Sequence, residues 1–171
     1  MVVLRATRKV LATLPPSAVA VGRSNTALGD WYVNRLVVDR RPLLLFVSST
    51  SLLSLVVPAR GLRGLTSRLA GLVGARLARL GIGPRTIELE TRAMSPVAIG
   101  PTVDRSVLGI MVDFAKSIPY YLEPGQWDNA TLHSAEEKLA ETPCYAGRSF
   151  EQTVFPDKKA PEVLRAKWEV N

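Results

Sequence analysis

Three aspartates and one arginine are the residues whose types could support acid–base chemistry or bind a divalent cation. Asp30 follows Gly29 in the segment SNTALGDWYVNRL, and Asp104, Arg105 and Asp113 lie in the segment DRSVLGIMVDFA. Two carboxylates that face one another in a cleft can transfer a proton or share a cation. That chemistry requires the two segments to meet, which helical spacing alone does not establish. The sequence favours a solvated helix face for Asp113.

Polar and amphipathic residues flank Asp30 and extend the candidate binding site to Asn25, Trp31 and Asn34. In a binding site, Asp30 would act as a base or an anchor and Trp31 as a stacking surface. In a structural role, Asp30 would accept hydrogen bonds from turn amides and Trp31 would fill the edge of the core. Because an aspartate beside a glycine is a common turn signal, the structural role is favoured.

Other titratable residues give weaker candidates. Glu88 and Glu90 share one face of a predicted strand, without an acid partner at a known distance. Cys144 and His133 have the types of a nucleophile and its base, but each is predicted in or near a loop. One cysteine and one histidine are too few for a conventional zinc site, and no nucleotide-binding loop or nucleophile elbow occurs. The sequence thus indicates no metal and no cofactor. It leans against an enzyme, and a small enzyme built on the three aspartates is the alternative.

Basic residues are concentrated in the first half of the chain. Residues 1–86 contain thirteen Lys or Arg and two acids, whereas residues 87–171 contain nine and thirteen, so the halves carry +11 and −4. This asymmetry predicts a basic surface for an anionic protein or a nucleic acid. The predicted patch consists of five arginines, Arg60, Arg63, Arg68, Arg76 and Arg79. Attraction between the two halves and the amino-acid usage of a GC-rich genome are alternative explanations of the charge.

The stretch 28–58 holds most of the strand signal. Three short apolar runs joined by polar turns predict an antiparallel β-meander, at 31–38, 43–47 and 52–57. Further strands are predicted at 2–6 and, from the alternation of apolar and polar side chains, at 86–93. Because 42–59 contains no charge and is flanked by arginines, a membrane-spanning helix is a rival interpretation, which the serine and threonine cluster in its middle argues against.

Two amphipathic helices are predicted to cover this sheet, at 61–80 and at 104–118. Arg76 falls within the apolar stripe of the first, and we expect its stem to pack while its guanidinium reaches water. Asp104 is the expected cap of the second helix. Short C-terminal helices are predicted at 134–141 and from Pro161 onward.

Two segments also carry a resemblance. SNTALGDWYVNRL at 24–36 and DRSVLGIMVDFA at 104–115, followed by LAETPC, resemble a family of small bacterial proteins classed only as a domain of unknown function. The resemblance covers roughly residues 2–145 and implies a bacterial, soluble, single-domain protein. It implies no reaction.

The chain length suits one α+β domain with a buried core, predicted at residues 1–145. Residues 146–171 are predicted to be a C-terminal extension, partly helical and either docked or loose. The single cysteine excludes an internal disulfide and indicates a reducing compartment, so we expect a cytoplasmic protein. The leading hypothesis is a non-enzymatic binding or interaction protein whose Arg-rich N-terminal half meets an anionic partner. Binding to an RNA or DNA backbone is an alternative to a protein partner.

Overall fold

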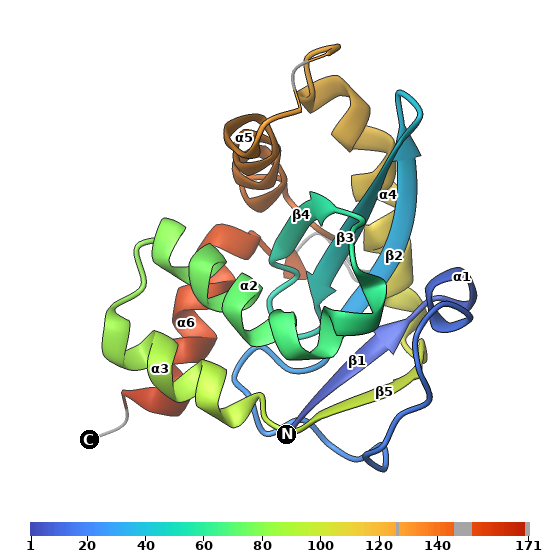
Figure 1. Cartoon of the computed structure of the whole chain (residues 1–171). Helices are drawn as coiled ribbons and strands as arrows, with labels where there is room; N and C mark the ends of the chain where they lie inside the picture. Colours follow the sequence, from blue (N-terminus) through green and yellow to red (C-terminus); the bar gives the residue numbers. More distant parts are fainter. Residues whose placement is uncertain (126, 146–151, 170–171) are drawn as a thin grey trace.

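A five-stranded mixed sheet forms the centre of the computed structural model, which describes residues 1–125, 127–145 and 152–169. The strands are β1 (Val2–Ala6), β2 (Trp31–Val38), β3 (Arg41–Ser48), β4 (Ser54–Pro58) and β5 (Val97–Pro101). They are ordered β4-β3-β2-β1-β5 (Figure 1). β2, β3 and β4 pair antiparallel, whereas β1 pairs parallel with both β2 and β5. The sheet is therefore wider than the predicted three-stranded meander and is not wholly antiparallel.

Helices cover both faces of this sheet. They are α1 (Arg8–Leu11), α2 (Leu65–Arg79) after the 3₁₀ turn η1 (Leu62–Gly64), α3 (Pro84–Ala93), α4 (Arg105–Tyr121), α5 (Asn129–Ala140) and α6 (Pro156–Trp168). α2, α3 and α6 lie on one side of the sheet, and α4 and α5 lie on the other (Figure 1). The chain is thus a three-layer arrangement with one hydrophobic core on each face of the sheet.

The alternation of side chains in β3 explains the two cores. Leu44 and Phe46 join the core under α2, and Leu43, Leu45 and Val47 join the core under α4 and α5. A continuous apolar run was the expected signature of a strand covered on both faces. The hairpin between β2 and β3 turns at Asp39 and Arg40, which both have positive φ, as two-residue hairpin turns require.

Two sequence interpretations are wrong. Residues 86–93 belong to helix α3 and do not form a strand. Pro84 occupies the first turn, where a missing amide donor is tolerated, and the buried Thr86 and Glu90 lie four residues apart on one helix face. The uncharged segment 42–59 is not a helix, because it forms most of β3 and β4. Among the residues that the structure describes, no helix is long and apolar enough to cross a membrane.

The other helices differ from prediction mainly at their ends. α2 and α4 overlap the predicted helices closely. α5 begins earlier than predicted because Asp128 caps it, accepting a hydrogen bond from the Thr131 amide at 2.9 Å. α6 begins at Pro156 and places Ala160 and Leu164 in the core under α2. The predicted boundary between residues 145 and 146 falls next to 146–151, which lie outside the described residues.

Candidate functional site

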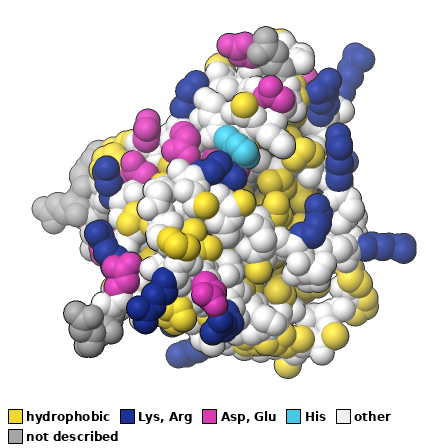
Figure 2. Space-filling model, turned by 60° about the vertical axis from the view of Figure 1, so that its left-hand side comes forward, with side chains coloured by type: hydrophobic (Ala, Val, Ile, Leu, Met, Phe, Trp, Pro, Cys, Tyr) yellow, Lys and Arg dark blue, Asp and Glu magenta, His cyan; other side chains and the backbone are white. Residues whose placement is uncertain are grey.

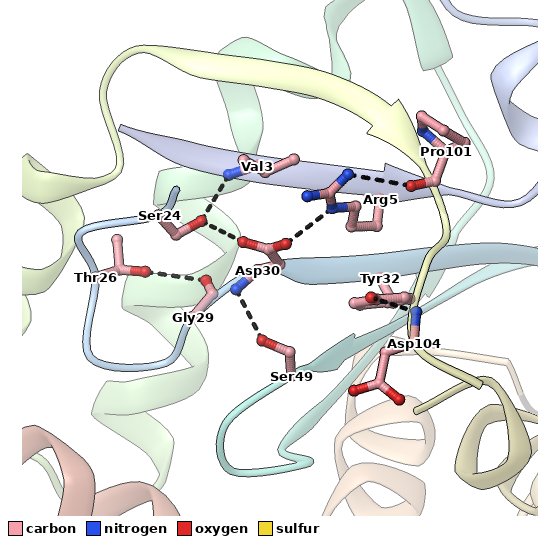
Figure 3. Close-up of polar contacts among 10 residues, drawn as sticks. All are labelled: Val3, Arg5, Ser24, Thr26, Gly29, Asp30, Tyr32, Ser49, Pro101 and Asp104. Atoms are coloured by element: carbon pink, nitrogen blue, oxygen red, sulfur yellow. Dashed lines mark hydrogen bonds and ion pairs between the residues drawn. The ribbon is translucent and has the colours of Figure 1, made fainter. Parts of the chain in front are cut away.

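Asp30 lies just before β2 and has a partner for each carboxylate oxygen (Figure 3). Its Oδ2 accepts a hydrogen bond from Arg5 Nε at 2.8 Å, and its Oδ1 accepts one from the Ser24 hydroxyl at 2.6 Å. Its backbone amide donates to Ser49 Oγ at 2.9 Å. A Cβ on Gly29, whose φ is +73°, would clash with the Ser49 and Thr50 side chains, so the Gly-Asp pair fits this turn. Asp30 therefore ties β1, the loop before β2 and the β3–β4 turn together.

The residues around Asp30 also have structural partners. Asn25 Oδ1 accepts a hydrogen bond from the N-terminal amine at 2.7 Å, and Asn34 Oδ1 accepts one from the Thr7 hydroxyl at 2.9 Å. The Trp31 side chain is fully buried in the core under α2. It therefore presents no stacking surface to a ligand.

The three aspartates do not line a common cavity. Asp104 caps α4 and accepts a hydrogen bond from the Ser106 amide at 2.8 Å, on the far side of Tyr32 from Asp30 (Figure 3). Asp113 and Arg105 line a cavity of about 430 Å³ between α4 and the segment 142–145. Neither Asp30 nor Asp104 is among the residues that line it. The paired-carboxylate arrangement that acid–base chemistry needs is thus not formed by these three side chains.

Cys144 is the remaining nucleophile candidate at that cavity. Burial raises the pKa of its thiol to about 11, and the negative charge of Asp113 contributes to the rise. The thiol is therefore protonated near neutral pH, whereas nucleophilic catalysis needs the thiolate. His133 does not line this cavity. Among the described residues, no group of three or more His, Cys, Asp or Glu side chains is arranged to hold a metal ion.

Two of the five predicted patch arginines belong to a network between α2 and α5. Arg76 is fully buried; its Nη1 lies 2.9 Å from Glu137 Oε1, and its Nε donates to the Ser54 carbonyl at 3.2 Å. Arg79 Nη2 lies 2.8 Å from Glu136 Oε2. The prediction that the Arg76 guanidinium reaches water is wrong. The side chain is buried because Glu136 and Glu137 of α5 pair with it. Arg76 therefore contributes nothing to the surface.

The other three arginines are exposed and follow β4. The side chain of Arg68 donates to the backbone carbonyls of Arg60 at 2.6 Å and of Gly61 at 3.2 Å. These bonds hold the main chain at Arg60 in place. Arg63 lies on η1, between Arg60 and Arg68 in the sequence. Arg60, Arg63 and Arg68 are all exposed. We call these three residues and the exposed Arg41 the arginine surface.

Arg41 and Arg60 line a second cavity, of about 400 Å³. The rest of its lining is mostly apolar and includes Pro42, Leu43, Pro58, Trp127 and Leu132. The guanidinium carbon of Arg41 lies 5.6 Å from the centre of the Trp127 ring, within cation–π range. An aromatic side chain from the acidic half of the chain thus lies beside the arginines of the basic half.

The pairing of β3 with β4 positions the two arginines. Leu43 pairs with Pro58, and the Ala59 amide donates to the Pro42 carbonyl at 3.1 Å. β4 ends at Pro58, and the Arg60 amide donates to the Pro58 carbonyl at 2.9 Å, so Arg60 lies in the turn that follows β4. Like charges that line one cavity repel each other. Among the carboxylates that the structure describes, none forms an ion pair with either arginine.

One margin of the molecular surface carries charge of a single sign. In Figure 2, dark-blue Lys and Arg side chains run down the right-hand margin of the face shown, whereas blue and magenta side chains are mixed over its left half. Positive charge therefore predominates along one margin of this face.

Fold and cavities together define a mixed α/β protein with an arginine-lined, aromatic-walled cavity at the end of a β-hairpin. The chain belongs to the family described as Domain of unknown function (DUF6933), whose model matches residues 3–159. This membership confirms the resemblance to an uncharacterised family. No curated protein and no solved structure matches the chain.

Proposed function

We propose that this protein is a non-enzymatic binding protein whose arginine surface meets an anionic partner. The observation that carries the proposal is the pair Arg41 and Arg60, which line one cavity while no described carboxylate pairs with either. Two guanidinium groups that line one cavity repel each other, and a bound anion would remove that repulsion. Arg63 and Arg68 extend the positive charge beyond the cavity.

The architecture suits such a role in our proposal. The antiparallel meander of β2, β3 and β4 is the scaffold, and the amphipathic helices α2 and α4 hold it from its two faces. Asp30 and Asp104 support the scaffold instead of reacting with a substrate, and Asp113 is an exposed residue of α4. We place the protein in the bacterial cytoplasm as one soluble domain at residues 1–145 with a C-terminal extension.

Polyphosphate, a polyanion without a base or sugar, tests this proposal without assuming which partner binds. Binding of labelled polyphosphate is measured by fluorescence anisotropy over a series of salt concentrations. We expect an affinity that falls linearly on a log–log plot against salt, because bound cations are released from the polyanion. The variant Arg41→Gln/Arg60→Gln should bind about tenfold or more weakly, because it loses two charge-assisted contacts.

The matched control removes two exposed arginines outside the arginine surface, as Arg23→Gln/Arg85→Gln. Both double variants lower the net charge by the same amount, so a non-specific charge effect would weaken both equally. We expect the control to retain the affinity within about twofold, in line with its unchanged cavity. Equal losses in the two variants, or an affinity independent of salt, would contradict the proposal.

A further inference from the structure

We infer that the cavity lined by Arg41, Arg60 and Trp127 binds a nucleotide unit, that is, a phosphate joined through a sugar to a planar base. The inference rests on the proposed function and names the ligand class for the same cavity. It follows from the combination of two guanidinium groups that pair with no described carboxylate and an apolar, partly aromatic wall.

The arginines match a phosphate better than a single carboxylate. A terminal phosphate carries about −1.5 to −2 charge near neutral pH, so two guanidinium groups are needed to balance it. The Arg41 guanidinium carbon lies over the Trp127 ring, 5.6 Å from its centre, and a planar guanidinium carries its N–H donors along its edge. Those donors have the fork geometry that binds two phosphate oxygens at once. Arg60 lines the cavity from the turn after β4, with its main chain held by Arg68.

The apolar lining supplies the surface for the base. Leu43, Pro58 and Leu132 line the cavity with the indole of Trp127, and the first three side chains carry no polar group. Aromatic and guanidinium planes stack on nucleobases without regard to sequence. A volume of about 400 Å³ lies at the lower end of the roughly 300–1,000 Å³ typical of small-molecule sites. The cavity thus suits one nucleotide and not a whole cofactor of two.

A duplex backbone would use this surface differently. Phosphates of a double helix are held by exposed basic side chains, and its bases stay stacked inside the helix. An apolar wall beside the arginines has a use only when a base is unstacked, as in a free nucleotide or a single strand. These are the two sources of the ligand chemistry that we infer.

Isothermal titration calorimetry with separate parts of the ligand tests the inference. The probes are AMP, ribose 5-phosphate, adenosine and octanoate, and a single-stranded oligoadenylate distinguishes the two sources. We expect AMP to bind about tenfold or more tightly than ribose 5-phosphate, because the base adds stacking. Adenosine and octanoate should bind more weakly than AMP. Oligoadenylate that binds more tightly than AMP, with a steeper salt dependence, would identify a strand; equal affinity would identify a free nucleotide.

Variants separate the base contact from the phosphate contact. Trp127→Leu should lower the AMP affinity to that of ribose 5-phosphate and leave ribose 5-phosphate binding within about threefold. Trp127→Phe, which keeps a ring, should recover part of the AMP affinity and verifies the effect if Trp127→Leu folds poorly. In the unaltered protein, the indole N–H resonance that Trp127→Phe removes from the NMR spectrum should shift during titration with AMP.

The failure of this inference is distinguishable from the failure of the proposed function. Equal binding of AMP and ribose 5-phosphate, or tighter binding of octanoate, would overturn the nucleotide assignment while polyphosphate still bound through Arg41 and Arg60. Absence of binding by AMP and polyphosphate alike would overturn both.

Discussion

The two ends of β4 differ in how their arginines are neutralised. At its beginning, Arg76 donates to the Ser54 carbonyl and Glu136 accepts a hydrogen bond from the Val56 amide at 2.9 Å, so a buried network satisfies the unpaired edge of the strand. Beyond its other end, Arg60 lines a cavity together with Arg41. The position of an arginine in the sequence therefore does not show whether it is structural or available to a ligand. That depends on whether a carboxylate lies close to it in the fold.

The largest effect is expected at the neutralised end. Glu136→Gln removes the charge that meets Arg76 and Arg79, whose guanidinium groups lie 3.5 and 2.8 Å from its Oε2. Breaking a buried pair on one side typically lowers the free energy of unfolding by about 3–5 kcal/mol, because a charge is left uncompensated. Urea denaturation measures the loss.

Glu137→Gln is the matched control for that variant, since Glu137 contacts Arg76 from a half-exposed position. We expect it to lower the free energy of unfolding by no more than about 1 kcal/mol, in keeping with solvent-screened ion pairs. If the two variants lost the same stability, the buried network would not be what holds α5 against β4.

An intermediate effect is expected at the Asp30 network. Asp30→Asn removes the charge that pairs with Arg5 and weakens an acceptor for Ser24, and both contacts are only partly buried. We expect a loss of about 1–3 kcal/mol in the free energy of unfolding, with polyphosphate affinity unchanged. Urea denaturation and the anisotropy titration of the same preparation measure both.

Asp113→Asn provides the contrast, because Asp113 is an exposed residue of α4. Its effect on stability should stay within about 0.5 kcal/mol. A stable Asp30→Asn variant that had lost ligand binding would move Asp30 from the scaffold to a binding site.

The fold was predictable where local pattern was sufficient. The apolar run of β3 and the Asp104 cap of α4 each report their own element. α3 was missed because eight residues of alternating polarity also fit about two turns of a two-sided helix, and Pro84 was the stronger signal. The parallel pairing of β1 with β5 joins segments more than ninety residues apart, for which no local pattern exists.

The candidate site was less predictable for the same reason. Arg60 was predicted from charge alone, but its neighbour Arg41 follows from the β3–β4 register and Trp127 from the placement of α5. Arg76 was misassigned because its partner Glu136 lies sixty residues away in sequence. A single tryptophan among the acidic residues near the start of α5 was the one signal that could have indicated the aromatic wall.

The smallest effect has the most diagnostic sign. Arg60→Gln removes one of two like charges that no described carboxylate neutralises, so it should leave the free energy of unfolding unchanged or raise it by about 0.2–1 kcal/mol. Arg76→Gln should lower it by several kcal/mol, because the buried Glu136 then keeps only Arg79 and Glu137 loses its ion-pair partner. Urea denaturation at low salt makes the repulsion visible, and added salt should abolish the gain. A loss of stability in Arg60→Gln would mean that Arg60, like Arg76, stabilises the fold. A gain in stability together with weaker polyphosphate binding would mean that Arg60 costs stability and serves to bind a ligand.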